Sequence, residues 1–145
     1  MSITKVEASD YLQHLINQPL QYGLKSPDMD LFDIGFGEYI NINNVCKYAI
    51  HFTYGIKLYW KNGKKEEFDS MASHIQFNSS IKALVGAKVK RIALSEKNDL
   101  WLDMGECHMV IVTEDSAEES WRFFWPSCDR PHLIGTSVDL YMDVD

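Results

Sequence analysis

The chain has 145 residues, of which 46% are hydrophobic, and its net charge is −7. This length suits one domain with a substantial core, and the composition excludes a disordered chain. Residues 1–85 hold eight Lys and Arg against nine Asp and Glu, whereas residues 86–145 hold six against twelve. Such an acidic balance argues against nucleic acid as a direct partner, because phosphates repel carboxylates. We therefore expect one domain over residues 1–145 with a strongly acidic second part.

The cysteines and the N-terminus bear on the cellular compartment. Cys46, Cys107 and Cys128 are an odd set without CxxC or Cys–His spacing. This pattern argues against a disulfide framework or a zinc site, and reduced thiols are typical of the cytoplasm. The N-terminal residues lack the apolar run of a signal peptide, and no stretch approaches the roughly 20 apolar residues that span a bilayer. The sequence predicts a cytoplasmic protein without a membrane segment.

The first predicted element is a short helix over residues 9–17. Ser9 is a suitable N-cap, and Pro19 stops the helix soon after its end. The apolar stripe at helical spacing consists of Tyr11, Leu12, Leu15 and Ile16. Residues 19–30, which are rich in Pro, Gly and Asp, predict a loop.

Strands are predicted next. Residues 31–36 alternate in part and predict a strand that enters a glycine-rich turn. Residues 47–54 predict a clearer strand, and the same period continues to Trp60. The pair Asn62-Gly63 is a strong hairpin signal because both residues favour positive φ. Residues 64–68 then predict a returning strand whose Lys and Glu suit an exposed edge.

The last part predicts a second helix and a series of short strands. Residues 78–85 have helical spacing, with Asn78 or Ser79 as the cap and Gly86 just beyond the end. Strand-like alternation follows around residues 89–94, 100–104, 107–112, 121–125 and 138–142. Without a βαβ rhythm, this order predicts an α+β domain built mainly on antiparallel sheet, as a curved sheet or partly open barrel, with two short helices.

No recognised catalytic pattern is present. None of the five histidines has an HExxH partner, and His51 and His108 fall inside predicted strands, where a structural role is expected. Cys107 and His108 are neighbours, but adjacent strand residues point to opposite faces and do not form a nucleophile–base dyad. We therefore assign no catalytic residue, no metal and no cofactor.

Two groups of carboxylates are candidate binding residues. The first group is Glu114, Asp115, Glu118 and Glu119. The second group is Asp28, Asp30 and Asp33. The second group has oxygen ligands suited to a divalent cation, but its spacing matches no EF-hand and is common in turns. An acidic patch that meets a basic protein is the functional interpretation of both groups, and solvated turns are the alternative. Further candidates are large aromatics on polar strand faces, either as interface residues or covered by helices: Tyr59, Trp101 and Phe124.

Several short motifs resemble a set of small bacterial proteins. They are Phe32-Asp33-Ile34-Gly35-Phe36-Gly37, Tyr48-Ala49-Ile50-His51-Phe52, Leu84-Val85-Gly86-Ala87-Lys88-Val89, Asp99-Leu100-Trp101-Leu102 and Glu118-Glu119-Ser120-Trp121-Arg122. Some proteins of this kind are similar to immunity proteins of bacterial toxin systems. The resemblance covers most of the chain after residue 28, departs from the set after His51, and carries over a fold-level likeness without catalytic residues.

The leading hypothesis is an immunity-type binding protein that neutralises a cognate toxin domain, such as a basic nuclease, through its acidic and aromatic-containing surface. The alternative is a small ligand-binding or enzymatic β-rich domain with carboxylates and His51 or His108 in a pocket. A purely structural subunit with a two-fold apolar interface is a third possibility. The sequence leaves the oligomeric state open.

Overall fold

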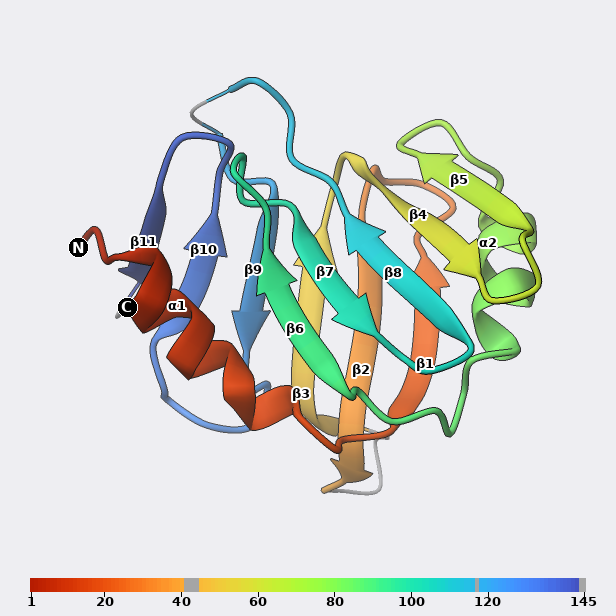
Figure 1. The fold of residues 1–145 in the computed structure, drawn as a ribbon, viewed down its shortest axis with the longest axis horizontal. Helices are drawn as coiled ribbons and strands as arrows, with labels where there is room; N and C mark the ends of the chain where they lie inside the picture. Colours follow the sequence, from red (N-terminus) through yellow and green to blue (C-terminus); the bar gives the residue numbers. More distant parts are fainter. Residues whose placement is uncertain (41–44, 117, 144–145) are drawn as a thin grey trace.

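A computed structural model of the chain describes residues 1–40, 45–116 and 118–143. In these residues, two short α-helices accompany two antiparallel sheets that stack face to face (Figure 1). The predicted α+β class, dominated by antiparallel sheet and with two short helices, is confirmed. The sheets remain open at their edges, so the architecture is a sandwich and not a barrel.

The first sheet has six strands in the order β1-β2-β3-β9-β10-β11. Their bounds are β1 Leu20–Lys25, β2 Phe32–Tyr39, β3 Cys46–Phe52, β9 Trp121–Phe124, β10 His132–Gly135 and β11 Leu140–Asp143. The second sheet has five strands in the order β5-β4-β8-β7-β6. Their bounds are β4 Gly55–Trp60, β5 Lys65–Asp69, β6 Arg91–Leu94, β7 Leu100–Asp103 and β8 Cys107–Ile111.

The core lies between the two sheets, because alternate residues of each strand point inward. Phe32 of β2 and Phe52 of β3 stack with ring centroids 4.8 Å apart, and Phe77 meets Phe32 edge-on at 4.9 Å. Trp121 of β9 is fully buried and lies against Gly135 of β10, where an added Cβ would be 2.2 Å from the indole. Burial of these large aromatic side chains is the main stabilising contribution.

Both helices begin earlier than predicted. Helix α1 is Lys5–Leu12, followed by a 3-10 turn, Gln13–Leu15, and α2 is His74–Lys82. The predicted N-caps at Ser9 and at Asn78 or Ser79 are wrong. Thr4 caps α1 in a capping box with Glu7, and the Ser73 side chain accepts a hydrogen bond from the Gln76 amide at the start of α2.

Several strand boundaries also differ from the predictions. The predicted loop over residues 19–30 contains β1, and β10 lacked a prediction altogether. The glycine-rich turn expected after residues 31–36 is instead a continuation of β2. The period from Lys47 to Trp60 belongs to two strands of different sheets, separated by Thr53 and Tyr54. The Asn62-Gly63 hairpin joins β4 to β5 as predicted, and β5 is an edge strand.

Candidate functional site

Antiparallel topology sends the connections between strands alternately to the two ends of the sandwich. The turn at Thr53 and Tyr54 passes from β3 of the first sheet to β4 of the second, so both sheets share that end. Six connections therefore meet there, at the upper side of Figure 1. They are residues 26–31, 53–54, 70–73, 95–99, 112–120 and 136–139. We name this the acidic end.

Charge is strongly segregated between the two ends. Among the described residues, the six connections of the acidic end hold one lysine, Lys97, and nine carboxylates. The carboxylates are Asp28, Asp30, Glu96, Asp99, Glu114, Asp115, Glu118, Glu119 and Asp139. Lys5 of α1 also reaches this end, where its Nζ donates to the carbonyls of Ser95 and Glu96. The connections of the opposite end carry five cations, Lys61, Lys64, Lys88, Lys90 and Arg130, and two carboxylates, Glu106 and Asp129.

Exposed apolar side chains accompany the carboxylates at the acidic end. Met29 is 57% exposed in the 26–31 turn, Met71 is 85% exposed after β5, and Val138 is 74% exposed in the 136–139 turn. Burial of such side chains against a partner is favourable, at about 25 cal/mol per Å² of apolar surface removed from water. Protein–protein interfaces combine a buried apolar centre with a polar rim.

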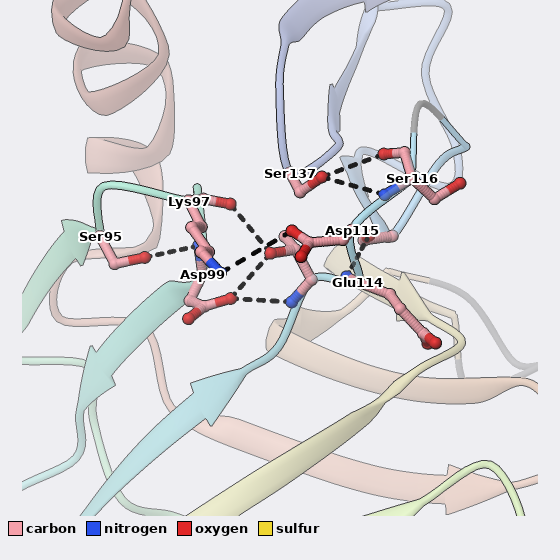
Figure 2. A network of polar contacts seen from close by, with 9 residues as sticks. Ser95, Lys97, Asp99, Glu114, Asp115, Ser116 and Ser137 are labelled. Atoms are coloured by element: carbon pink, nitrogen blue, oxygen red, sulfur yellow. Dashed lines mark hydrogen bonds and ion pairs between the residues drawn. The ribbon is translucent and has the colours of Figure 1, made fainter.

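Hydrogen bonds fix the 112–120 loop to its neighbours (Figure 2). The Thr113 amide and hydroxyl both donate to Asp99 Oδ1, at 2.8 and 2.9 Å. The Ser116 amide donates to Ser137 Oγ at 3.2 Å, and that hydroxyl donates to the Ser116 carbonyl at 3.1 Å. The loop is therefore tied to the five-stranded sheet through Asp99 and to the six-stranded sheet through Ser137.

Asn98 joins the two sheets beneath this loop. Its backbone has a φ of 66°, and its side chain is buried, with 5% exposure. The Trp121 indole of β9 donates to the Asn98 carbonyl at 2.9 Å, and Asn98 Nδ2 donates to the Thr136 carbonyl at 2.9 Å. One residue between β6 and β7 thus bonds to both β9 and the β10–β11 turn.

The four carboxylates of the first predicted group do not share one environment. Glu114, Asp115 and Glu118 are exposed at the acidic end. Asp115 lies 3.7 Å from Lys97, and Glu118 accepts a hydrogen bond from the Tyr54 hydroxyl at 3.3 Å. Both contacts lie at the surface and contribute little to stability. Ala117, within the predicted acidic run, lies outside the described residues.

Glu119 turns instead toward the outer face of the six-stranded sheet. It accepts two hydrogen bonds from Arg122, from Nε at 3.0 Å and from NH2 at 2.8 Å. Arg122 NH1 also lies 2.8 Å from His132 Nδ1 and 3.4 Å from Asp143 Oδ2. This bidentate pairing compensates the charge of Glu119, so it adds less to the acidic end than its three neighbours do.

The second predicted group is divided in the same way. Asp28 and Asp30 are exposed in the 26–31 turn at the acidic end. Asp33 lies on the outer face of β2, where it accepts a hydrogen bond from the Tyr22 hydroxyl at 3.0 Å and lies 3.3 Å from His51 Nε2. Sequence proximity therefore grouped Asp33 wrongly with Asp28 and Asp30. Its neighbours are cross-strand residues that the sequence spacing did not indicate.

Two pockets bear on the carboxylate–histidine alternative, because each is lined by His108 and a carboxylate. One has a volume of about 360 Å³ and is lined by Glu106, Cys107 and His108 among others. The other has a volume of about 220 Å³, lies on the five-stranded sheet and is lined by Arg91, Asp103 and His108 among others. Asp103 accepts hydrogen bonds from the Gly105 amide and from Arg91, and lies 3.5 Å from His108 Nε2. The Gly105 amide first, and then Arg91 and His108, hold the pKa of Asp103 below its usual value. A carboxylate that already accepts several hydrogen bonds and has a lowered pKa is a poor general base. The cavity beside Asp103 is also smaller than typical ligand sites.

Burial of Cys107 argues against the nucleophile–base dyad of Cys107 and His108 that was considered from the sequence. Cys107 is 1% exposed, and burial raises the pKa of its thiol to about 12. His108, the next residue, lies exposed on the opposite face of β8, as the strand alternation predicts. The pair therefore lacks both the thiolate and the geometry of a catalytic dyad.

The predicted surface aromatics do lie on outer sheet faces. Tyr59 and Trp101 are parallel, with centroids 6.2 Å apart, on the five-stranded sheet, and Trp101 is 39% exposed. Phe124 lies on the six-stranded sheet, 4.8 Å from each of the rings of His51 and His132. The three aromatics are thus divided between opposite faces and do not form one patch with the carboxylates.

The described part of the chain contains no group of three or more His, Cys, Asp and Glu side chains with the arrangement of a metal site. None of its helices has the length and hydropathy needed to cross a bilayer.

Comparison with known proteins adds no assignment. No protein-family model, no curated protein and no solved structure matches the chain.

The Asn98 connection has a measurable contribution. Asn98→Ala removes the hydrogen bond to the Thr136 carbonyl and places at positive φ a residue that tolerates the left-handed region less well than asparagine does, so we expect a loss of about 2–4 kcal/mol in unfolding free energy. Asn98→Gly relieves the backbone strain and should lose about 1 kcal/mol less. Urea unfolding of the three proteins measures both effects. Equal losses in the two variants would contradict the role of the positive φ.

His132 should make stability depend on pH. Burial, and then the neighbouring Arg122, lower the pKa of His132 from its usual 6.5. The unfolded chain then binds the proton more readily, so unfolding free energy falls as pH decreases through 6.5. We expect His132→Gln to reduce the difference in unfolding free energy between about pH 7.5 and about pH 5.5. His74→Gln, far from Arg122 in sequence and on α2, is the control. If the unfolding free energies of His132→Gln and wild type depended on pH in the same way, protonation of His132 would be excluded as the cause.

Proposed function

We propose that this protein binds a basic protein partner through its acidic end, and that it acts as an immunity-type protein that neutralises a toxin domain. The observation that supports the proposal is the concentration of nine carboxylates and three exposed apolar side chains on the connections of one end. The segregation of cations to the other end gives the molecule a directional field.

Binding proceeds in two stages on this proposal. The field of the acidic end first attracts and orients a cationic partner, which raises the association rate. Met29, Met71 and Val138 then contact apolar groups of the partner, and the burial of these side chains slows dissociation. The hydrogen bonds through Asn98, Asp99 and Ser137 hold the loops in place before binding. A preorganised surface loses less conformational entropy on association.

Neutralisation follows if the acidic end covers the partner's active site. A nuclease has a cationic active-site surface because its substrate is a polyanion. A rigid acidic surface competes for that surface, while the protein itself is repelled by nucleic acid. The motif resemblance to immunity proteins agrees with this mechanism, and reduced Cys46, Cys107 and Cys128 agree with action in the cytoplasm.

The sharpest test uses two triple variants with the same change in charge. The first, Glu114→Lys, Asp115→Lys and Glu118→Lys, reverses exposed carboxylates of the acidic end. The control, Glu38→Lys, Glu106→Lys and Asp129→Lys, reverses exposed carboxylates elsewhere. Each protein is used as bait to capture a partner from the source cell's lysate and its secreted effectors. The rate at which the captured partner associates with each protein is then measured at low and high salt.

We expect the control to keep the wild-type association rate within about threefold and the acidic-end variant to lose about tenfold to a hundredfold at low salt. The association rate of the acidic-end variant should also depend less on salt concentration. Equal rates for the two variants would exclude the acidic end as the steering surface. Neutralisation is tested separately: addition of this chain should abolish the partner's toxic activity, and a fully active complex would contradict the immunity mechanism.

A further inference from the structure

A groove lies between the edge strand β1 and helix α2. Its volume is about 760 Å³, and most of the surface that lines it is apolar. Three exposed apolar side chains line it: Leu24 at 51% exposure, Ile75 at 69% and Val85 at 46%. Gly23 and Ile81 also line the groove and pack closely, because Ile81 Cγ1 lies 2.6 Å from where a Cβ on Gly23 would be.

Helix α2 has a second stripe that the core does not use. Phe77 and Ile81 are buried in the core. Ile75, Ser79 and Lys82 line the groove at i, i+4 and i+7 and therefore form one face of the helix. This exposed stripe runs along the groove beside β1. It is the geometry that a further helix uses when it packs against a helix and a strand.

The edge of β1 is closed to an added strand. The Lys25 amide donates to Asn78 Oδ1 at 2.9 Å, which occupies one end of the edge. At the other end, the Leu20 amide donates to the Ala87 carbonyl at 2.9 Å, and the Gly86 amide donates to the Leu20 carbonyl at 2.8 Å. Strand addition needs a row of free backbone groups. An occupant of the groove therefore binds through side chains, as an amphipathic helix does.

Charged residues lie beyond both ends of the groove. A second hollow of about 350 Å³ shares Leu24, His74 and Asn78 with the groove and is also lined by Lys25, Asp33 and residues of the 26–31 turn. Lys25 is buried and Asp33 lies 3.3 Å from His51, whereas Asp28 and Asp30 are exposed in that turn. Lys82 lies in the last turn of α2 at the opposite end. A complementary helix therefore has Lys or Arg at the end beside the two aspartates and an acidic residue beside Lys82.

We propose that this groove binds an amphipathic helix of a protein partner, with its apolar face on Leu24, Ile75 and Val85 and its basic end beside Asp28 and Asp30. The inference rests on the proposed function and deepens it, because the second hollow, which adjoins the groove, is lined by residues of the 26–31 turn at the acidic end. The helix of the partner would thus be held next to the surface that attracts the partner's cations.

The test uses a defined probe with no net charge. It is a synthetic peptide of about 14 residues, with leucines at i, i+3, i+4 and i+7, two glutamates at the N-terminus, two arginines at the C-terminus and glutamines elsewhere. A scrambled peptide of the same composition lacks the apolar stripe. Affinity is measured by titration, and amide chemical shifts of the full chain locate the site.

We expect the probe to shift amides of β1 and α2 and to bind more tightly than the scrambled peptide. Ile75→Gln should weaken it by about fivefold or more. The matched control is Val6→Gln, because Val6 is 71% exposed on the other short helix. Equal binding of the two peptides, or no greater loss for Ile75→Gln than for Val6→Gln, would overturn the proposal.

The two proposals can fail independently in this design. The probe is electrically neutral, so the variant with Glu114, Asp115 and Glu118 reversed should bind it as wild type does. If that variant still binds the probe and also associates with the basic partner at the wild-type rate, the acidic-end proposal is wrong and the groove proposal stands. If wild type does not bind the probe, but the variant associates more slowly with the basic partner than wild type does, the groove proposal is wrong and the acidic-end proposal stands.

Discussion

The arrangement of the acidic end depends on one buried residue, Asn98. Its carbonyl receives the Trp121 indole proton, and its side chain donates to the Thr136 carbonyl, so the turn between β6 and β7 is bonded to the other sheet at two points. Asn98 makes both contacts with a φ of 66°, a left-handed conformation that asparagine tolerates better than most residues do. Asp99, the next residue, then fixes Thr113 and with it the loop that carries the exposed glutamates. Core packing and surface geometry are thus connected through a single turn.

Much of the secondary structure could be predicted because local signals agreed with the fold. Asn62-Gly63 predicted its hairpin, and the alternation in β9 matches the burial of that strand. The alternation in β3 and β8 matches burial except at Ala49 and Val110, which are buried as well. The helix starts were also written in the sequence: Thr4 precedes Glu7 by three residues, and Ser73 precedes Gln76 by three. Those capping pairs are stronger evidence for an N-terminus than the apolar spacing that placed the caps at Ser9 and Asn78 or Ser79.

Strand β1 was missed because its hydropathy and its burial run in opposite senses. Leu24 is 51% exposed, whereas Lys25 is 7% exposed and places its ammonium group 5.6 Å from the Phe32 ring. Tertiary packing against α2 determines this inversion, and no local pattern reports it. Strand β10 has only four residues, His132–Gly135, directly after Pro131, which is too short to establish a period.

The candidate site was predictable in its composition and not in its arrangement. The sequence identified Glu114, Asp115 and Glu118 as one group and Asp28 with Asp30 as another. That these groups share one end follows from strand order, a non-local property. Their separation from Asp33 and Glu119 likewise follows from cross-strand neighbours and from the outer sheet face. The exposed apolar loop residues and the groove beside α2 had no signal in the sequence, because exposure of an apolar side chain is decided by the tertiary fold.

Hydrogen–deuterium exchange of the chain with and without its basic partner would show directly whether the acidic end is the binding surface. We expect slower exchange in the complex at residues 26–31, 70–73, 112–116 and 136–139. Protection confined to residues 61–64, 83–90 and 104–106, at the cationic end, would contradict this expectation.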